Sequence, residues 1–526
     1  MPNLTRRDFI KTTSMAALAF AATGLPLGNE VFAASDCTVK TRYGTFNGFV
    51  DKNGVKTWLG IPYAQPPVGK LRWQPTQPLK PSNKTRDAKN FGASAVQAID
   101  EIEKASANPQ SEDCLTLNIW TRGNGKNKPV MFFIHGGSFM AGGSSEPLQN
   151  GSNLAAAHDV VLVSINYRLN VFGFINLGVI DSAYEDTVHL GLNDQIAALT
   201  WVKENIANFG GDPDNVTIFG ESAGSISCML LMVTPAAKGL FQKAIPESGP
   251  SRFMHDVQHG EQLAEDFLNL SGTRKMSDLM KKSADELRNI YLQLISQRSK
   301  TMHSDFMPAC DGKFLPSDPF TAIKNGDARD IKLLTGTNSY EWGYWLLYDE
   351  NYFKNFSATH EKLSPVMSRC KARTSRTDKE IYRAWLNGRL DTEENYMAYL
   401  NQIDWRVGQE LDAENQSKFN DVYYYLFSDT SLREDLGSFH SIELAFVFNN
   451  PFDELLPNPN PTLVRQVQAS WAAFAATGNP NNEFIPHWEK YSAGNRQTME
   501  LSSKGCVCHK DLNTQHLNAL RYVYED

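Results

Sequence analysis

The organisation of the chain can be read outward from Val216-Thr217-Ile218-Phe219-Gly220-Glu221-Ser222-Ala223-Gly224. An apolar, β-branched run leads into Gly-x-Ser-x-Gly, and the residues that follow, up to Met232, are compatible with a helix. A strand, a tight turn and a helix in this order form the context of a nucleophile elbow. Such a turn strains the serine backbone, and the two glycines keep side chains out of the space where strand and helix cross. We therefore predict that Ser222 presents its hydroxyl above a sheet as a nucleophile.

The composition is compatible with one large α/β domain. The chain has 526 residues, of which 41% are hydrophobic, enough to bury a sizeable core. The formal net charge is -8 and no long basic run occurs, so nucleic acid is not expected as a partner. After the amino-terminal segment no stretch of about 20 apolar residues occurs, so we expect no stable membrane anchor in the mature protein.

The amino terminus carries an export pattern. Thr5-Arg6-Arg7-Asp8-Phe9-Ile10-Lys11 matches the twin-arginine signal, and the apolar stretch from Met15 to about Leu27 is too short and interrupted to span a membrane stably. Val31-Phe32-Ala33 places small or aliphatic residues where a signal peptidase cleaves. We predict a signal peptide over residues 1–33 and a mature domain over residues 34–526. The twin-arginine export machinery would deliver this domain to the periplasm or the medium.

The cysteines do not indicate a dense disulfide framework, because seven is an odd number in a large chain. Cys506 and Cys508 lie beside His509, which is compatible with a metal site, but no second cysteine pair supplies the other ligands. A strand with both cysteines on one face is the favoured interpretation, and no metal is expected.

A second glycine-rich turn follows the apolar run from Val130 to Ile134, which suits a strand buried on both faces. The turn is His135-Gly136-Gly137-Ser138-Phe139. At the carboxyl end of a central strand, such a turn lets backbone N–H groups converge as an oxyanion hole requires. A simple tight turn is the alternative, and the serine elbow downstream favours the functional interpretation.

The surrounding segments predict a parallel sheet. Residues 38–61 alternate around a turn at 51–54, which predicts a hairpin meander, and residues 160–167 form another buried strand. Residues 194–206 have apolar side chains near helical spacing and end before Gly210. Strand, helix, strand, serine turn and helix describe parallel strands with right-handed crossovers. The nucleophile and the oxyanion donors then lie at the carboxyl ends of neighbouring strands.

The chain resembles the type-B carboxylesterase family of α/β-hydrolases, which contains bacterial para-nitrobenzyl esterases, animal carboxylesterases and cholinesterases. The matching motifs are the serine elbow, the glycine-rich turn, Gly60-Ile61-Pro62-Tyr63-Ala64, Glu112-Asp113-Cys114-Leu115, Asn166-Tyr167-Arg168-Leu169 and Gly191-Leu192-Asn193-Asp194-Gln195. The resemblance extends over essentially the whole mature chain. It implies the α/β-hydrolase fold: a large, mostly parallel central sheet flanked by helices, with helical insertions over 255–300 and 350–420 that cap the site.

A serine nucleophile needs a base and an acid that orients the base, and in this fold they follow in the order Ser, acid, His. The segment from Lys332 to Glu341 resembles the family's strand and acid loop, so Glu341 is the predicted acid. Trp342 stands where the family usually has Gly. His440 lies in a segment similar to the family's His-Gly-x-Glu-Leu-x-x-Val-Phe, with Ser441 in place of Gly, and is the predicted base.

The resemblance also assigns supporting groups. The oxyanion donors are the backbone N–H groups of Gly137, Ser138 and Ala223. Gly136 and Glu221 support the site, the latter without acting as a base, and Ser248 orients the acid. Two pairs match structural ion pairs of the family, Arg72 with Glu112 and Arg168 with Asp194. Cys114 matches a disulfide cysteine of animal relatives, but no cysteine between Trp73 and Cys114 is present to bond with it.

These assignments predict a serine carboxylic-ester hydrolase that works through an acyl-enzyme on Ser222, without metal or organic cofactor, on hydrophobic or medium-sized small-molecule esters. A specialised carbamate, thioester, amide or lactone is an alternative substrate. A non-catalytic, cholinesterase-like binding protein is a second alternative, which the presence of all three triad residues disfavours. The lack of tryptophan between Glu101 and Gln110 argues against a cholinesterase. Trp342 and residues 344–347 are either an apolar wall of the site or core.

Overall fold

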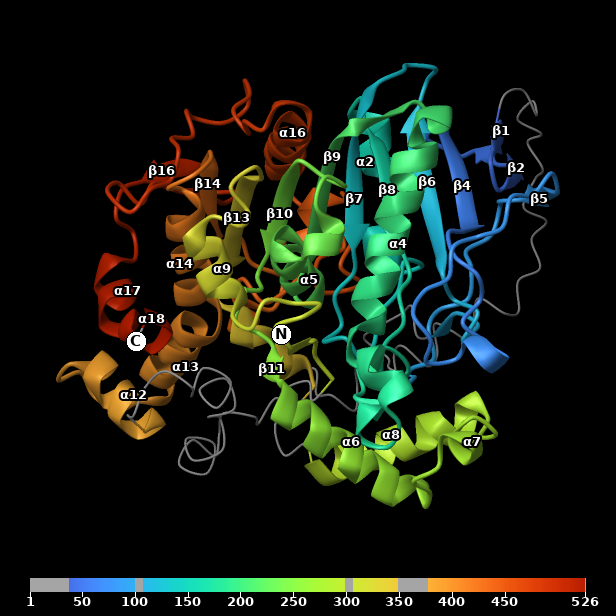
Figure 1. The fold of residues 1–526 in the computed structure, drawn as a ribbon. Helices are drawn as coiled ribbons and strands as arrows, with labels where there is room; N and C mark the ends of the chain where they lie inside the picture. Colours follow the sequence, from blue (N-terminus) through green and yellow to red (C-terminus); the bar gives the residue numbers. More distant parts are fainter. Residues whose placement is uncertain (1–36, 100–106, 299–305, 349–376, 526) are drawn as a thin grey trace. The chain divides into compact units, whose positions relative to one another are not determined.

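The central element of the fold is a mixed sheet, which has 11 strands in the residues that the structure describes (Figure 1). The structure is a computed structural model that describes residues 37–99, 107–298, 306–348 and 377–525. The predicted signal peptide lies outside these residues. In spatial order the strands are β16 (Val507–His509), β15 (Thr498–Leu501), β14 (Val422–Phe427), β13 (Lys332–Asn338), β10 (Lys243–Glu247), β9 (Gly211–Glu221), β7 (Lys128–Ile134), β8 (Val161–Ile165), β6 (Thr116–Arg122), β4 (Val55–Pro62) and β3 (Phe49–Val50).

The strands from β15 through β8 pair in parallel, and antiparallel strands close both ends of the sheet. β16 is antiparallel at one end, and β6, β4 and β3 are antiparallel at the other. The predicted large, mostly parallel sheet is confirmed.

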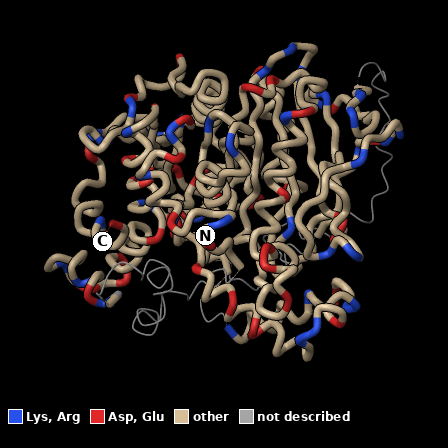
Figure 2. Tube along the Cα trace, in the orientation of Figure 1, with Lys and Arg blue, Asp and Glu red and all other residues tan. Residues whose placement is uncertain are grey.

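The sequence of β7 illustrates why these strands lie inside. Parallel strands covered on both faces are apolar on both faces. Val130, Phe132 and Ile134 pack into one hydrophobic core, and Met131 and Phe133 pack into a second core across the sheet. All five are fully buried. Figure 2 shows few charged residues along the central strands.

Helices cover both faces of the sheet. The first core receives buried residues from α4 (Leu190–Asn205), α5 (Ala223–Val233), α9 (Pro319–Asn325) and α14 (Val407–Gln416). The second receives them from α2 (Ser152–Ala157), α15 (Leu444–Val447) and α16 (Pro461–Thr477). The helix predicted over 194–206 is confirmed as α4, which begins about one turn earlier and is followed by the left-handed Gly210, φ 91°.

The predicted hairpin meander is also confirmed. β1 (Thr38–Thr41) pairs antiparallel with β2 (Gly44–Asn47), and β3 pairs antiparallel with β4. The turn between β3 and β4 is closed by the Gly54 N–H, which donates to the Asp51 carbonyl at 3.0 Å. β2 also pairs with β5 (Thr85–Asp87), so β1, β2 and β5 form a small sheet of their own.

Both predicted insertions contain helices. The first holds α6 (Val257–Ser271), α7 (Met276–Leu279) and α8 (Ala284–Arg298), which lie together in Figure 1, and the short strands β11 (His255–Asp256) and β12 (Ala309–Cys310) bracket it. Of the second, residues 350–376 lie outside the described residues. The remainder holds α12 (Asp378–Leu386), α13 (Glu393–Leu400), a π-helical turn η10 (Asn401–Arg406) and α14, and the described chain ends with α17 (Thr514–Leu520) and α18 (Tyr522–Glu525).

The register of the central strands brings their carboxyl ends to one level. Ile134 of β7 pairs with Gly220 of β9, and Glu221 pairs with Glu247 of β10, which pairs in turn with Gly336 of β13. The residues that follow these positions therefore emerge side by side at one edge of the sheet, where open α/β sheets place their sites.

Candidate active site

Ser222 occupies a strained turn between β9 and α5. Its backbone has φ 58° and ψ -120°, a conformation that costs energy for a residue with a Cβ and persists only where neighbours enforce it. Its N–H donates to the Glu247 carbonyl at 3.0 Å. A Cβ on Gly224 would lie 2.0 Å from the Ile134 carbonyl oxygen, and one on Gly220 would lie 2.5 Å from it. Both positions therefore admit only glycine, as the elbow prediction requires.

The glycine-rich turn after β7 packs directly on the elbow. A Cβ on Gly136 would lie 2.9 Å from the Glu221 carbonyl oxygen and 3.2 Å from the Cβ of Ser222. The predicted supporting position of Gly136 thus corresponds to close backbone approach between the two turns.

The predicted oxyanion donors lie in these two turns. Gly137 and Ser138 have positive φ angles of 97° and 56°, and Ala223 is the first residue of α5. Within the described ranges, the N–H groups of these three residues form no hydrogen bond with another protein group. Gly137 and Ser138 also line the same cavity as Ser222. In the described residues, these two turns therefore contain three N–H donors that no protein group accepts from.

Glu341 and His440 form a direct contact. Glu341 begins the 3-10 helix η8 (Glu341–Leu347), just after β13, and its Oε2 lies 2.7 Å from Nδ1 of His440. The His440 backbone N–H also donates to the Glu341 carbonyl at 3.2 Å. These two contacts, one from the side chain and one from the main chain, hold the His440 ring beside the Glu341 carboxylate.

The other oxygen of Glu341 is held by two donors. Oε1 accepts hydrogen bonds from Ser248 Oγ at 2.7 Å and from the Asn338 N–H at 2.6 Å. The carboxyl group is fully buried, so these bonds fix its orientation. The structure thus places Ser248 where the family resemblance puts it, on the acid. Asn338 was not among the predicted residues, because a backbone N–H leaves no mark in a side-chain pattern.

Aromatic rings enclose the imidazole of His440. Trp405 of η10 lies 4.4 Å from it between ring centroids, Trp345 lies 5.5 Å away nearly parallel, and Tyr344 packs edge-on at 6.0 Å. These rings exclude water from one side of the imidazole. Low local polarity strengthens the electrostatic contacts of a buried ion pair.

Trp342, which replaces the family's usual glycine, does not enter the cavity. It is completely buried, its N–H donates to Asn401 Oδ1 at 3.0 Å, and its indole N–H donates to Asp404 Oδ2 at 2.8 Å. Both acceptors belong to η10, so the substitution is accommodated by the second insertion.

The charge around His440 is strongly negative. Its Nδ1 faces Glu341, and its Nε2 lies 3.0 Å from Oε1 of Glu221. Burial by itself would lower the pKa of this imidazole, but the two carboxylates outweigh burial and raise the pKa well above its usual value. Glu221 is also the acceptor of a hydrogen bond from Ser441 Oγ, at 2.7 Å.

Two more carboxyl groups, those of Glu443 and Glu247, are buried near Glu221, and the sequence analysis assigned them no role. Glu443 accepts a hydrogen bond from the Asn338 amide, and Glu247 accepts one from the Trp471 indole at 3.2 Å. Burial and the nearby charge of Glu221 raise the pKa of Glu443 to about 8. Burial and Glu443 raise the pKa of Glu247 well above its usual value. Glu443 lies within the histidine motif, which was a signal that could have indicated it.

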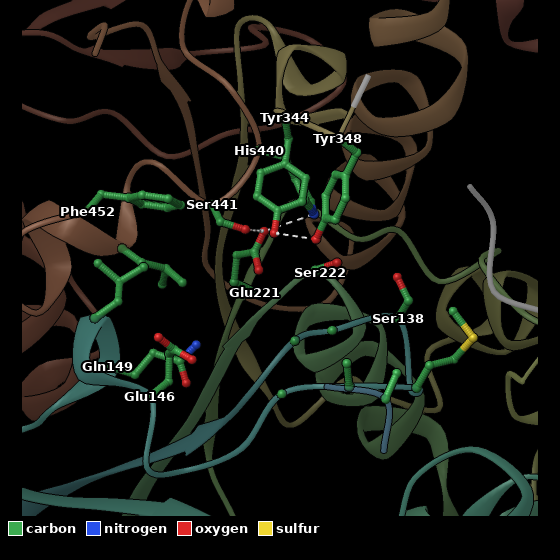
Figure 3. Close-up of a pocket in the computed structure, with 18 of the residues that line it drawn as sticks. Ser138, Glu146, Gln149, Glu221, Ser222, Tyr344, Tyr348, His440, Ser441 and Phe452 are labelled. Atoms are coloured by element: carbon green, nitrogen blue, oxygen red, sulfur yellow. Dashed lines mark hydrogen bonds and ion pairs between the residues drawn. The ribbon is translucent and has the colours of Figure 1, made fainter. Parts of the chain in front are cut away.

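Ser222 and His440 line one cavity of about 430 Å³, a volume typical of small-molecule sites. Aromatic and aliphatic side chains line part of it, namely Tyr291, Leu292, Ile295, Tyr344, Trp345, Tyr348 and Phe452. Polar side chains line another part, namely Glu146, Gln149, Glu221, Ser441 and Asp453. Figure 3 shows Glu146 and Gln149 on the opposite side of the cavity from Tyr344 and Tyr348.

The helical cap predicted over the site and the apolar wall predicted near Glu341 are each found only in part. α8 of the first insertion contributes Tyr291, Leu292 and Ile295 to the cavity, whereas the described part of the second insertion contacts His440 without lining the cavity. Of the predicted wall, Tyr344 and Trp345 line the cavity. Trp342 is wholly buried, and Leu346 and Leu347 pack against the cores, so for these three the core alternative holds.

The two predicted ion pairs are present. Arg72 contacts Glu112 through two nitrogens, and Arg168 contacts Asp194 at 2.8 Å, deep inside the protein. Cys114 is buried as a free thiol.

The carboxyl-terminal cysteines follow the strand interpretation in part, because Cys508 lies in β16 and Cys506 immediately precedes that strand. Cys506 and Cys508 both pack against the second core, and Val507 between them is exposed. In the part of the chain that the structure describes, no group of three or more His, Cys, Asp or Glu side chains is arranged to hold a metal ion. No helix in that part is long and apolar enough to cross a membrane.

Comparison with protein families gives a match over almost the whole chain. A family model described as the carboxylesterase family matches residues 35–520. The chain is 38% identical over 487 residues to a para-nitrobenzyl esterase of Bacillus subtilis (strain 168), which covers 89% of this chain and 95% of that protein. It is 31% identical over 567 residues to an acetylcholinesterase of Danio rerio, which covers 92% and 87%.

Solved structures agree with these relatives. A thermophilic PNB esterase superimposes with a TM-score of 0.82 at 36% identity, which covers 92% of this chain and 99% of that one. A second PNB esterase superimposes with a TM-score of 0.80 at 35% identity, with the same coverage.

Proposed function

The chain belongs to the carboxylesterase family, has its α/β-hydrolase fold and is a carboxylic-ester hydrolase, and from this premise we propose that it acts through an acyl-enzyme on Ser222 with Glu341 and His440 as the other triad members. One observation carries the proposal. Ser222 on its strained elbow and His440 on its buried acid line the same cavity, which the oxyanion turn also lines.

The mechanism follows from the roles that this geometry permits. His440 takes the proton of Ser222 at Nε2 while Ser222 attacks the ester carbonyl, and His440 then gives that proton to the departing alcohol. Water repeats the cycle and releases the acid. Glu341 holds the Nδ1–H tautomer and stabilises the imidazolium. The N–H groups of Gly137, Ser138 and Ala223 would stabilise the tetrahedral oxyanion.

The cavity lining supports neutral, apolar esters of medium size as substrates. Its aromatic and aliphatic part suits a hydrophobic acyl or alcohol group. Its polar part carries the carboxyl groups of Glu146, Glu221 and Asp453, and no described lining residue is Lys or Arg. A substrate with its own negative charge would therefore be repelled. The relative named para-nitrobenzyl esterase suggests aromatic esters as a first class to examine.

The proposal is tested with para-nitrophenyl esters of increasing acyl length, comparing the wild-type mature protein with Ser222→Ala. We expect kcat to fall by about 10⁴-fold or more in the variant, since removal of a triad nucleophile has effects of this order. The acyl length with the highest kcat/KM then measures the apolar part of the cavity. Equal rates in the two proteins would contradict a serine mechanism at this residue.

We also propose that residues 1–33 direct export through the twin-arginine route to the periplasm or the medium. The support is the Arg6-Arg7 pair within its consensus, followed by an apolar stretch and a cleavage motif. Replacing both arginines by lysine should leave the activity in the cytoplasm of a bacterial host, unprocessed, whereas the wild type is exported and begins near Ala34. Unchanged fractionation of the variant would refute this route.

A further inference from the structure

Ser441 is the unusual member of the histidine segment, because the family pattern noted above has glycine directly after the histidine. It has a φ of 72°, in the left-handed region that glycine enters without strain and other residues rarely adopt. A serine kept in this conformation indicates that its side chain makes a compensating contact.

That contact is with Glu221. The Ser441 hydroxyl donates to Oε1 of Glu221 at 2.7 Å, across 220 positions of sequence. Figure 3 shows Ser441 and His440 both joined by dashed lines to the Glu221 carboxylate. Two consecutive residues of one turn thus contact the same carboxylate oxygen.

The contact between His440 and Glu221 is one of charge. Nε2 of His440 lies 3.0 Å from Oε1 of Glu221, but no hydrogen bond is formed, since the oxygen lies away from the direction in which an N–H bond at Nε2 points. An in-line bond would occupy the nitrogen that must accept the proton of Ser222.

Four groups from three parts of the fold face this contact. They are Glu341 at the other ring nitrogen, Glu443 before α15, Glu247 of β10 behind Glu443, and the phenol of Tyr344 from η8. In the described residues, the Ser441 hydroxyl donates a hydrogen bond to the Glu221 side chain and thereby orients this carboxylate.

We propose that Ser441 is a positioning residue of the esterase reaction: its hydroxyl holds the Glu221 carboxylate beside Nε2 of His440 and out of line with it, so that Nε2 remains available to Ser222. The inference rests on the proposed function. Without the hydroxyl, the carboxylate keeps its contact with the imidazolium, turns toward it and traps His440 in the charged form, which cannot act as a base.

The experiment measures kcat/KM against pH for a neutral para-nitrophenyl ester, because the acid side of this profile reports ionisation of the base in the free enzyme. Ser441→Ala and Ser441→Gly should each move the midpoint of the acid side upward by about one pH unit. Glycine relieves the backbone strain, so it keeps the fold while it removes the hydroxyl. A purely structural role would impair the alanine variant and leave the glycine variant with the wild-type profile, which would overturn the inference.

Glu221→Gln supplies the second half of the test. Loss of a neighbouring negative charge should move the midpoint to lower pH, and adding Ser441→Ala to this variant should cause no further shift, since Ser441 acts through the Glu221 charge. A further upward shift in the double variant would overturn the inference. The matched control is Ser438→Ala, which removes a hydroxyl that donates to the Phe427 carbonyl at 3.0 Å and should leave the midpoint in place.

Failure of the inference and failure of the proposed function give different results. An active Ser222→Ala variant would refute the serine mechanism whatever Ser441 does. An inactive Ser222→Ala variant together with an unmoved midpoint in both Ser441 variants would refute only the role of Ser441.

Discussion

His440 makes different contacts at its two ring nitrogens, and the difference decides what the residue can do. At Nδ1 the carboxylate of Glu341 lies in hydrogen-bond contact, which orients the ring. At Nε2 the carboxylate of Glu221 acts by charge. In the proposed mechanism both charges stabilise the imidazolium that would form when Ser222 loses its proton. They also raise the pKa of His440 in the resting enzyme.

The raised pKa of His440 predicts the pH dependence of hydrolysis. Because the base must be neutral to take a proton, kcat/KM should rise with pH and have its midpoint above 6.5, the ordinary imidazole value. The measurement is kcat/KM of the wild type between about pH 5 and pH 9 with a neutral ester. A midpoint at or below the ordinary imidazole value would contradict the negative surroundings described for this ring.

Glu443 predicts how stability depends on pH. Its folded pKa of about 8 lies above the ordinary 4.5, so the protonated carboxyl group contributes stability fully below pH 4.5 and this contribution is lost as the pH rises through about 8. The melting temperature of the wild type should therefore fall between about pH 6 and pH 9. Glu443→Gln cannot ionise and should show a smaller fall by calorimetry. An equal fall in both proteins would mean that Glu443 does not carry this effect.

At the scale of elements, sequence patterns predicted turns, strands and helices that depend on neighbouring residues, but they did not predict contacts between residues far apart in the chain. The elbow, the hairpin at Gly54 and helix α4 follow from turn residues and periodicity within a short window. The orientation of Trp342 could not be predicted in this way, because Asp404, which accepts a hydrogen bond from its indole, lies 62 positions later, in the second insertion. The bond between Ser441 and Glu221 escaped prediction for the same reason.

Helix α8 is the element that should set acyl length. Ile295 lines the cavity from α8, so Ile295→Trp would fill apolar space and should lower kcat/KM for a para-nitrophenyl octanoate about tenfold or more, with little change for the acetate. Gln293→Trp adds the same ring on an exposed position of this helix and should leave both rates unchanged. Equal losses for long and short esters in Ile295→Trp would argue against α8 as part of the acyl or alcohol pocket.

At the scale of the molecule, the sheet assembles a site from residues far apart in the chain. The register of β7, β9, β10 and β13 places the oxyanion turn, the nucleophile, Ser248 and the acid loop at one edge. The parallel order could be predicted from the strand and helix pattern, and the triad from motif and chain order. The negative charge of the assembled cavity could not be predicted from the sequence, because Glu146 and Asp453 line the cavity from loops that contain no recognisable motif.

This acidic lining predicts discrimination by substrate charge. A para-nitrophenyl adipate with a free carboxylate should have a kcat/KM about tenfold or more below that of its methyl ester, since the negative charge meets like charges in a partly desolvated cavity. The difference should narrow in high salt, which screens such repulsion. Equal rates for the two esters at low salt would show that the carboxyl groups of the lining do not act on the substrate.

The central claim is that Ser222 is a nucleophile activated by His440, and covalent labelling tests it most directly. The mature protein is incubated with a serine-reactive fluorophosphonate, and its intact mass and peptide masses are followed over time. We predict one adduct per chain on the peptide that contains Ser222, no adduct in Ser222→Ala, and labelling slowed by about 10³-fold or more in His440→Ala. An adduct on another residue, or equal labelling rates in wild type and His440→Ala, would contradict the claim.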